Sequence, residues 1–139
     1  MNADDMHLYP DLYGRLYNTF VDNAREWLTE LENGLLSLEK NPYGKEDVNH
    51  IFRIAHNMKS SSGTIGLDCI YRYAHSVEDL LLLMRDGKLI VDKALIDLLL
   101  LAVDVMWEMV EAAALKKPLE SMVCEKLIQQ IEMYKSCCV

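Results

Sequence analysis

The sequence contains little glycine and proline, and it lacks the alternation of apolar and polar residues that is typical of strands. Only 6 of its 139 residues are glycine and 3 are proline. Leu, Met, Ala, Glu and Lys, which favour helices, are abundant instead. Apolar residues make up 51% of the chain, enough for one domain of this length to bury a full core. These features predict a single all-α domain over residues 1–139.

Basic residues are also scarce. The chain has 14 Lys and Arg against 22 Asp and Glu, and its formal net charge is -8. Nucleic acids and anionic membranes both need a basic face on the protein that binds them. We therefore expect no nucleic acid and no membrane among the main partners.

No long apolar run is present. The longest, LLLLAV at residues 98–103, is far shorter than the roughly 20 residues that span a bilayer. The opening residues, MNADDMHLYP, lack the basic start and apolar stretch of a signal peptide. Without a leader we expect a cytoplasmic protein, with Cys69 and Cys124 as small core residues and Cys137 and Cys138 as free thiols.

Apolar residues recur at helical spacing in five segments. Short polar connections make successive helices antiparallel neighbours, which predicts an up-down bundle of about five helices with a four-helix core. Asp68 and Asp92 are suitable N-caps, Gly87 suits a helix end, and Pro118 suits a first helical turn. The predicted helices cover about 11–38, 46–60, 68–85, 92–115 and 118–135.

The apolar residues of each predicted helix form a stripe that should face the core. Five methionines fall within these patterns, and we expect them to be buried: Met84, Met106, Met109, Met122 and Met133. The stripe of the first helix comprises Leu12, Leu16, Phe20, Trp27, Leu31 and Leu35. The stripes of the second and third comprise Val48, Ile51, Phe52, Ala55 and Met58, and Ile70, Ala74, Val77, Leu81 and Met84.

The stretch HNMKSSSGTIG, residues 56–66, stands out at the end of the second predicted helix. His56 lies at the edge of the apolar stripe, so one ring nitrogen can meet a neighbouring helix while the other faces solvent. Lys59 is one turn further on and lies beside it. The small residues that follow would form the connection over 61–67 and leave room for a partner to approach.

His75 and Glu78 lie one turn apart on the third predicted helix. At about 1.5 Å per residue, His56 and Glu78 stand roughly 7 and 15 Å from the predicted bend. Side-chain length and the uncertainty of helix ends can close this gap, so a cluster with Lys59 is feasible. A carboxylate on one imidazole nitrogen would leave the other a better nucleophile, and a lysine offers a cation to a phosphoryl group.

Other interpretations remain open at this point. Taken singly, each of these residues is more often an ordinary polar residue at a helix edge. His50, His56, His75 and Cys69 could be zinc ligands, but their spacing provides no close ligand pair. The chain contains no H-E-x-x-H, G-x-S-x-G or phosphate-loop motif. The alternatives to phosphoryl transfer are a helical docking or scaffold bundle and a metal-dependent bundle enzyme.

Residues 51–87 resemble the core of histidine phosphotransfer (HPt) domains, and especially those at the amino terminus of chemotaxis kinases. The shared pattern is an apolar-Phe-Arg start, Ala-His, Lys three residues later, a small-residue stretch with two glycines, then His and Glu three apart before a leucine-rich end. The matching residues are Phe52, Arg53, Ala55, His56, Lys59, Ser61, Ser62, Gly63, Thr64, Gly66, His75, Glu78, Leu80 and Leu81. One departure is Ser60, where the family usually has glycine.

The resemblance implies a role for each site residue. His56 would be phosphorylated on its outward nitrogen, Glu78 would hold the inward nitrogen, and Lys59 and His75 would complete a hydrogen-bonded network. The phosphoryl group would come from the catalytic domain of a histidine kinase and leave to the aspartate of a response-regulator receiver domain. We expect no cofactor or metal, and no stand-alone enzyme activity, although the chain could be part of a longer kinase.

Overall fold

The computed structural model describes residues 10–119 and 125–136. This part of the chain forms five α-helices and no strand, as the sequence predicted. The helices are α2 (Pro10–Lys40), α3 (Lys45–Ile65), α4 (Asp68–Arg85), α5 (Lys93–Ala114) and α6 (Glu125–Ser136).

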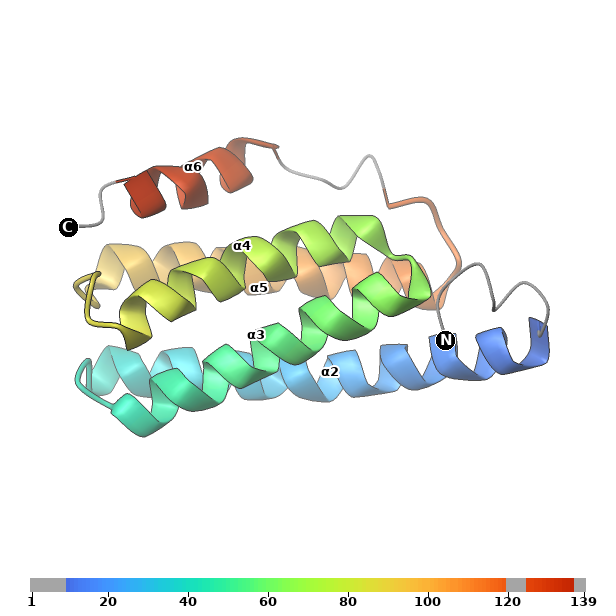
Figure 1. The fold of residues 1–139 in the computed structure, drawn as a ribbon, viewed down its shortest axis with the longest axis horizontal. Coiled ribbons are helices and arrows are strands. Elements are labelled where there is room, and N and C mark those ends of the chain that lie inside the picture. Colours follow the sequence, from blue (N-terminus) through green and yellow to red (C-terminus); the bar gives the residue numbers. More distant parts are fainter. Residues whose placement is uncertain (1–9, 120–124, 137–139) are drawn as a thin grey trace.

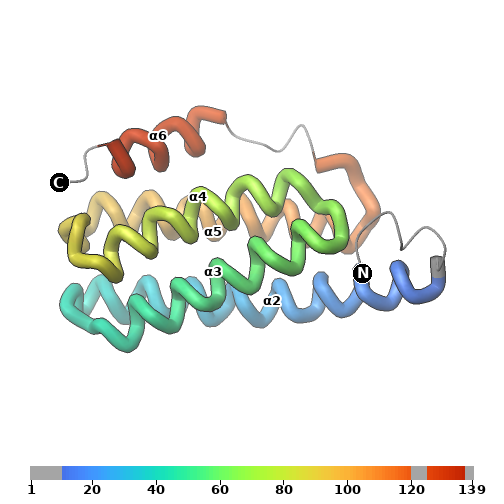
Figure 2. The backbone as a smooth tube through the Cα atoms, viewed as in Figure 1, coloured from blue at the N-terminus to red at the C-terminus, as the bar shows by residue number. Residues whose placement is uncertain are grey.

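Helices α2 to α5 form an up-down bundle in which each helix runs opposite to the one before it (Figure 1). The tube view shows α3 and α4 as a hairpin, with α2 beside α3 and with α5 behind (Figure 2). Helix α6 lies outside these four and packs on α4. Helices α2 and α5 thus complete a four-helix core around the α3–α4 hairpin.

The helix ends are set by local backbone chemistry. Asp92 caps α5 because its side chain accepts a hydrogen bond from the backbone N–H of Leu95, at 2.9 Å. Helices α3 and α4 each end at a glycine in the left-handed region, Gly66 with φ 84° and Gly87 with φ 73°. The residue after each glycine donates its backbone N–H to the carbonyl five residues earlier, Leu67 to Ser62 and Lys88 to Leu83. These hydrogen bonds satisfy carbonyl groups in the last turn of each helix.

Two predicted boundaries and one predicted cap were wrong. Helix α3 does not end at Ser60 but continues to Ile65, so Ser61–Ile65 belong to the helix and not to the connection. Pro118 is not in a helix, and the described part of the last helix starts at Glu125. Asp68 is the first residue of α4 and not its cap.

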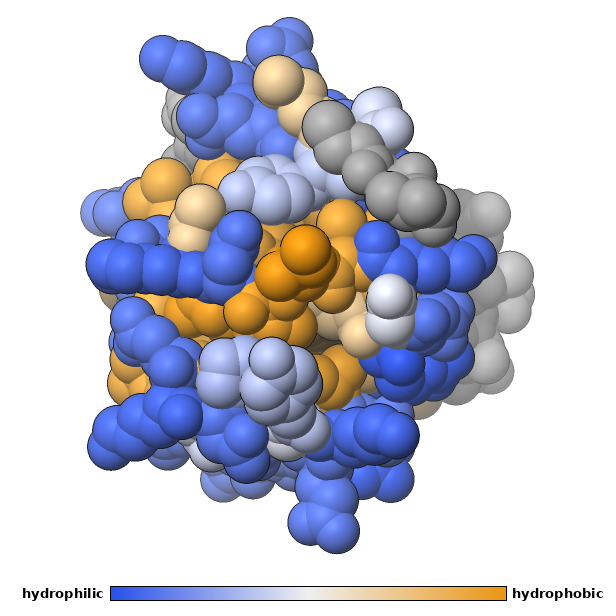
Figure 3. Space-filling view, turned by 90° about the vertical axis from the view of Figure 1, so that its left-hand side faces the viewer, coloured by the Kyte–Doolittle hydropathy of each residue, from blue (hydrophilic) through white to orange (hydrophobic). Residues whose placement is uncertain are grey.

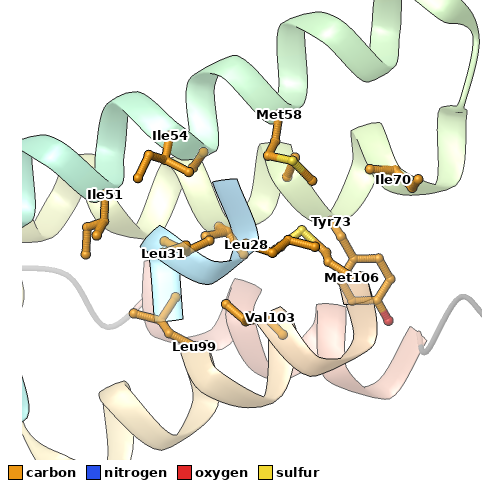
Figure 4. Close-up of a cluster of buried hydrophobic side chains, with 14 of the residues drawn as sticks. Leu28, Leu31, Ile51, Ile54, Met58, Ile70, Tyr73, Leu99, Val103 and Met106 are labelled. Atoms are coloured by element: carbon orange, nitrogen blue, oxygen red, sulfur yellow. The ribbon is translucent and has the colours of Figure 1, made fainter. Parts of the chain in front are cut away.

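The core fills the space between α2, α3, α4 and α5 (Figure 4). The predicted stripes of α3 and α4 are buried except for Phe52, which is half-buried against the guanidinium of Arg85. In α2 the stripe was partly wrong: Leu16 is exposed, and Leu12 and Trp27 are half-buried. The buried hydrophobic side chains of α2 are Tyr17, Phe20, Val21, Ala24, Leu28, Leu31, Leu35 and Leu38.

Three of the five methionines expected in the core, Met84, Met106 and Met109, are buried. Met133 is 66% exposed, and Met122 lies outside the described residues. Met133 lines an apolar groove of about 370 Å³ between α5 and α6. Separately, one end of the bundle shows hydrophobic surface ringed by hydrophilic residues (Figure 3). Cys69 is half-buried, while Cys124, Cys137 and Cys138 lie outside the described part. No described helix combines the length and apolarity needed to cross a membrane.

Candidate functional site

His56 lies on α3 at the border between core and solvent, as predicted. The preceding residue, Ala55, is buried, whereas 54% of the His56 side chain is exposed. One edge of the imidazole therefore meets α4 and the other is open to an approaching molecule.

Glu78 meets the inner edge of that imidazole from α4. Its residue is only 7% exposed, and its Oε2 lies 2.6 Å from Nδ1 of His56. An ionised carboxylate can only accept hydrogen bonds, so Nδ1 carries the proton of a neutral imidazole. The lone pair is then on Nε2, which makes that atom the nucleophile of the site.

Lys59 supplies the counter-charge that a buried carboxylate needs. Its Nζ donates a hydrogen bond to Oε1 of Glu78 at 2.6 Å, and its side chain is 21% exposed. Both oxygens of Glu78 are therefore occupied, one by the histidine and one by the lysine. The carboxylate is held in one orientation, and with it the ring of His56.

His75 lies next to this cluster but is not hydrogen-bonded to His56 or Glu78 in the described structure. Its Nε2 faces Oδ1 of Asp79 at 3.7 Å, and its ring stacks obliquely on Tyr71 at 5.8 Å between centroids. The structure thus brings together three of the four predicted site residues and places the fourth at their side. A role for His75 in the reaction stays a prediction.

The small residues after Lys59 include Ser62, which packs inside the hairpin, and Ser60, Gly63 and Thr64, which are exposed. Ser62 is fully buried, and its hydroxyl donates back to the carbonyl of Met58 at 2.6 Å. A side chain at Gly63 would sit 3.1 Å from the ring of Tyr71 on α4. Ser60, in contrast, is exposed on the His56 side of the helix, so this position remains available to a partner.

The zinc set considered from the sequence is not brought together. His50 pairs with Glu30 of α2 at 3.6 Å instead. Within the described ranges, the residues that could jointly hold an ion are His75, Glu78 and Asp79, with one candidate ligand atom of each within 4.8 Å of the others. Two lysines already hold these carboxylates, since Lys59 contacts Glu78 and Lys135 contacts Asp79. This arrangement does not favour a metal-dependent reaction.

Sequence reasoning missed Asp79 and Lys135. Nζ of Lys135, on α6, donates to Oδ2 of Asp79 at 2.8 Å and to Oε1 of Glu132 at 3.0 Å. The spacing of His75 and Asp79, four residues apart on one helix, could have indicated their pairing. No local signal links Lys135 to residues more than fifty positions earlier.

Known proteins share the sequence pattern and the fold of this chain. Residues 15–114 match the family model described as "Hpt domain". The chemotaxis protein CheA of Treponema pallidum is 36% identical over 99 residues, which cover 71% of this chain and 12% of that protein. The chain thus spans about an eighth of the length of this curated relative.

Two solved structures share the fold. The phosphorylated P1 domain of CheA3 from R. sphaeroides, solved in complex with CheY6, superposes with a TM-score of 0.81 at 28% identity, covering 90% of this chain and 98% of that one. The CheA phosphotransferase domain from Thermotoga maritima gives 0.68 at 33% identity, covering 70% and 93%. Since the family match takes in most of the α2–α5 bundle that carries His56 and Glu78, the chain belongs to the Hpt domain family, the histidine phosphotransfer domains.

Proposed function

We propose that this chain relays a phosphoryl group through Nε2 of His56 in a chemotaxis or related two-component pathway. The observation that carries the proposal is the 2.6 Å contact between Nδ1 and Glu78, combined with the exposure of the rest of the ring. The contact presents one nitrogen lone pair to solvent on a rigid helical scaffold. Residues 1–139 would act as one phosphotransfer domain.

Each transfer exchanges one bond to phosphorus for another. In the first, the lone pair of Nε2 forms a nitrogen–phosphorus bond while the bond from the γ-phosphorus of ATP to its bridging oxygen breaks, and ADP leaves. In the second, a carboxylate oxygen of a receiver-domain aspartate attacks the phosphorus and the bond to Nε2 breaks. Glu78 keeps the Nδ1 proton in place through both steps.

Lys59 and His75 have supporting roles in this proposal. The Lys59 ammonium balances the charge of Glu78 and gives the site a cation close to the incoming phosphoryl group. His75, with Asp79 behind it, adds a polar group at the edge of the same site.

The proposed partners are a histidine kinase catalytic domain as donor and a response-regulator receiver domain as acceptor. The complex of the similar CheA3 domain with CheY6 supports a receiver as acceptor. Because the donor step uses ATP, the proposal also places the protein in the cytoplasm. These contacts should be transient, with a small interface.

The test is labelling with a histidine kinase and radioactive ATP. The parent chain should acquire acid-labile label, and His56→Gln should acquire none. His50→Gln is the matched control, since His50 is also an exposed histidine of α3 with a glutamate partner, and it should label like the parent. Equal labelling of parent and His56→Gln would refute phosphotransfer and leave a docking bundle as the function.

A further inference from the structure

Helix α6 is joined to α4 at both of its ends by ion pairs. At its start, Glu125 pairs with Arg72 at 3.0 Å, and near its end Lys135 pairs with Asp79 at 2.8 Å. Between them Leu127 and Ile131 are buried. The two ion pairs are similar in kind, but only the second lies next to the phosphotransfer site.

Asp79 follows Glu78 directly on α4. A carboxylate oxygen of each residue and a ring nitrogen of His75 lie within 4.8 Å of one another. The site therefore holds two carboxylates, although only that of Glu78 contacts His56 and Lys59. A second acceptor so close could draw the Lys59 ammonium away, because flexible lysine side chains readily exchange carboxylate partners.

Lys135 holds this second carboxylate. It bonds Oδ2 of Asp79, while Oδ1 faces His75. Burial alone would lower the pKa of Lys135, but its hydrogen bonds to Asp79 and Glu132 raise the pKa above the usual value. Lys135 is therefore charged and able to neutralise Asp79 over the physiological range.

We propose that Lys135 is a positioning residue of the His56 site. It holds the carboxylate of Asp79 toward α6, so that Asp79 does not compete with Glu78 for the Lys59 ammonium. Lys135 thereby links α6 to the reaction: while its ammonium holds Asp79, Glu78 keeps both of its partners and the imidazole stays oriented. This inference rests on the proposed function and extends it to a residue outside the four-helix core.

The test uses phosphoramidate, a small phosphoryl donor, so that docking of a kinase does not enter the result. Nε2 of His56 attacks the phosphorus, the nitrogen–phosphorus bond of the donor breaks, and ammonia leaves. Lys135→Met should slow labelling by about threefold to tenfold, the size of coupling expected between neighbouring charged groups. In the ¹⁵N spectrum of the His56 ring, it should reduce the signal of the form protonated at Nδ1.

Three further variants separate positioning from simple stabilisation. Glu125→Gln breaks the ion pair at the other end of α6 and should leave labelling unchanged, even if the melting temperature falls. Lys135→Arg keeps the positive charge and should restore the parental rate. In an Asp79→Asn chain, which lacks the competing charge, adding Lys135→Met should cause no further loss.

The outcomes distinguish this inference from the proposed function. If the parent chain takes no label from phosphoramidate or from the histidine kinase, the proposed function itself fails. If the parent is labelled and Lys135→Met reacts at the same rate with an unchanged Nδ1 signal, the inference alone fails. Equal slowing by Lys135→Met and Glu125→Gln, or a further loss in the Asp79→Asn chain, would also overturn it.

Discussion

His56 and Glu78 lie at the same depth in the α3–α4 hairpin, which brings Nδ1 and Oε2 to 2.6 Å. His56 is nine residues before the end of α3 at Ile65, and Glu78 is ten residues after the start of α4 at Asp68. At 1.5 Å per residue the two stand about 14 and 15 Å from the connection. The contact therefore needs no distortion of either helix, and both residues are held by the packed core beneath them.

Removing the carboxylate should harm both reaction and stability. In Glu78→Ala, Nδ1 loses its partner and the half-buried Lys59 loses its counter-ion. We expect phosphorylation to slow by about tenfold to a hundredfold, as when the carboxylate partner of a metal-binding imidazole is removed. The free energy of unfolding should fall by at least about 1–3 kcal/mol, the cost of leaving a buried polar group unsatisfied.

Phosphorylation rates and urea unfolding of the same preparations would measure both effects. Glu30→Gln is the control, because Glu30 also pairs with a histidine of α3, His50, but both side chains are about half exposed. It should change neither quantity. A Glu78→Ala chain that reacts at the parental rate would remove Glu78 from the mechanism.

Bulk at position 60 should block partners without blocking the histidine. Ser60 is exposed, one turn from His56 on the same side of α3. Ser60→Trp should therefore slow transfer from the kinase and to the receiver, while labelling by phosphoramidate stays close to the parental rate. Asn18→Trp, an exposed position on α2, serves as control. Parental transfer rates in Ser60→Trp would mean that partners do not contact this face.

Glycine at position 60 should cost stability. Position 60 is well inside α3, because the helix continues to Ile65. Ser60→Gly should then lower the free energy of unfolding by about 0.5 kcal/mol, the difference in helix propensity between these residues. Urea unfolding would measure it, and an unchanged or raised free energy would contradict the helical assignment of this segment.

Two glycines of α2 provide a matched test of helix packing. A Cβ at Gly34 would overlap Cγ2 of Ile51 on α3, whereas a Cβ at Gly14 would meet nothing within 4 Å. Gly34→Ala should destabilise the bundle by about 1–3 kcal/mol through overpacking. Gly14→Ala should stabilise it by about 0.5–1 kcal/mol, because alanine favours a helix interior. Thermal and urea unfolding should give opposite signs, and equal signs would contradict the close approach of α2 and α3.

An ion pair between α2 and α5 should make stability depend on pH. Hydrogen bonds from Arg25 to both oxygens hold the pKa of Glu111 below its usual value of 4.5. A carboxyl with a lowered folded-state pKa stabilises the fold above its unfolded pKa, and this contribution is lost as pH falls through the folded pKa. Since the pair is exposed, the effect should be small and weaker in high salt.

The comparison to make is the melting temperature of the parent and of Glu111→Gln at pH 7 and pH 3. The parent should melt at the higher temperature at pH 7, and the difference should be smaller at pH 3. A constant difference between them would contradict the assignment to this carboxyl.

The sequence predicted the bundle well because its apolar stripes are regular. It misplaced the end of α3, because serine and glycine usually form turns. In the structure Ser62 and Thr64 instead donate to carbonyls one turn earlier, and small residues let α4 approach closely. Tertiary packing thus overrode local preference, and the corrected helix length is what brings His56 level with Glu78.

The polar surroundings of the site were harder to predict than its centre. Lys59 and Glu78 follow from helical spacing plus the hairpin. The pairing of Asp79 with Lys135 depends on where α6 docks, and no periodicity within either helix specifies that. His75 was expected in the central network, whereas its Nε2 faces Asp79, four residues further along α4.

The most direct test of the account is the position of the phosphoryl group on the ring. The chain, labelled with ¹⁵N, would be phosphorylated and examined for nitrogen–phosphorus coupling by NMR. We predict one phosphorylated nitrogen, Nε2 of His56, with Nδ1 still protonated against Glu78. Coupling to Nδ1 of His56, or to a ring nitrogen of His50 or His75, would contradict the account.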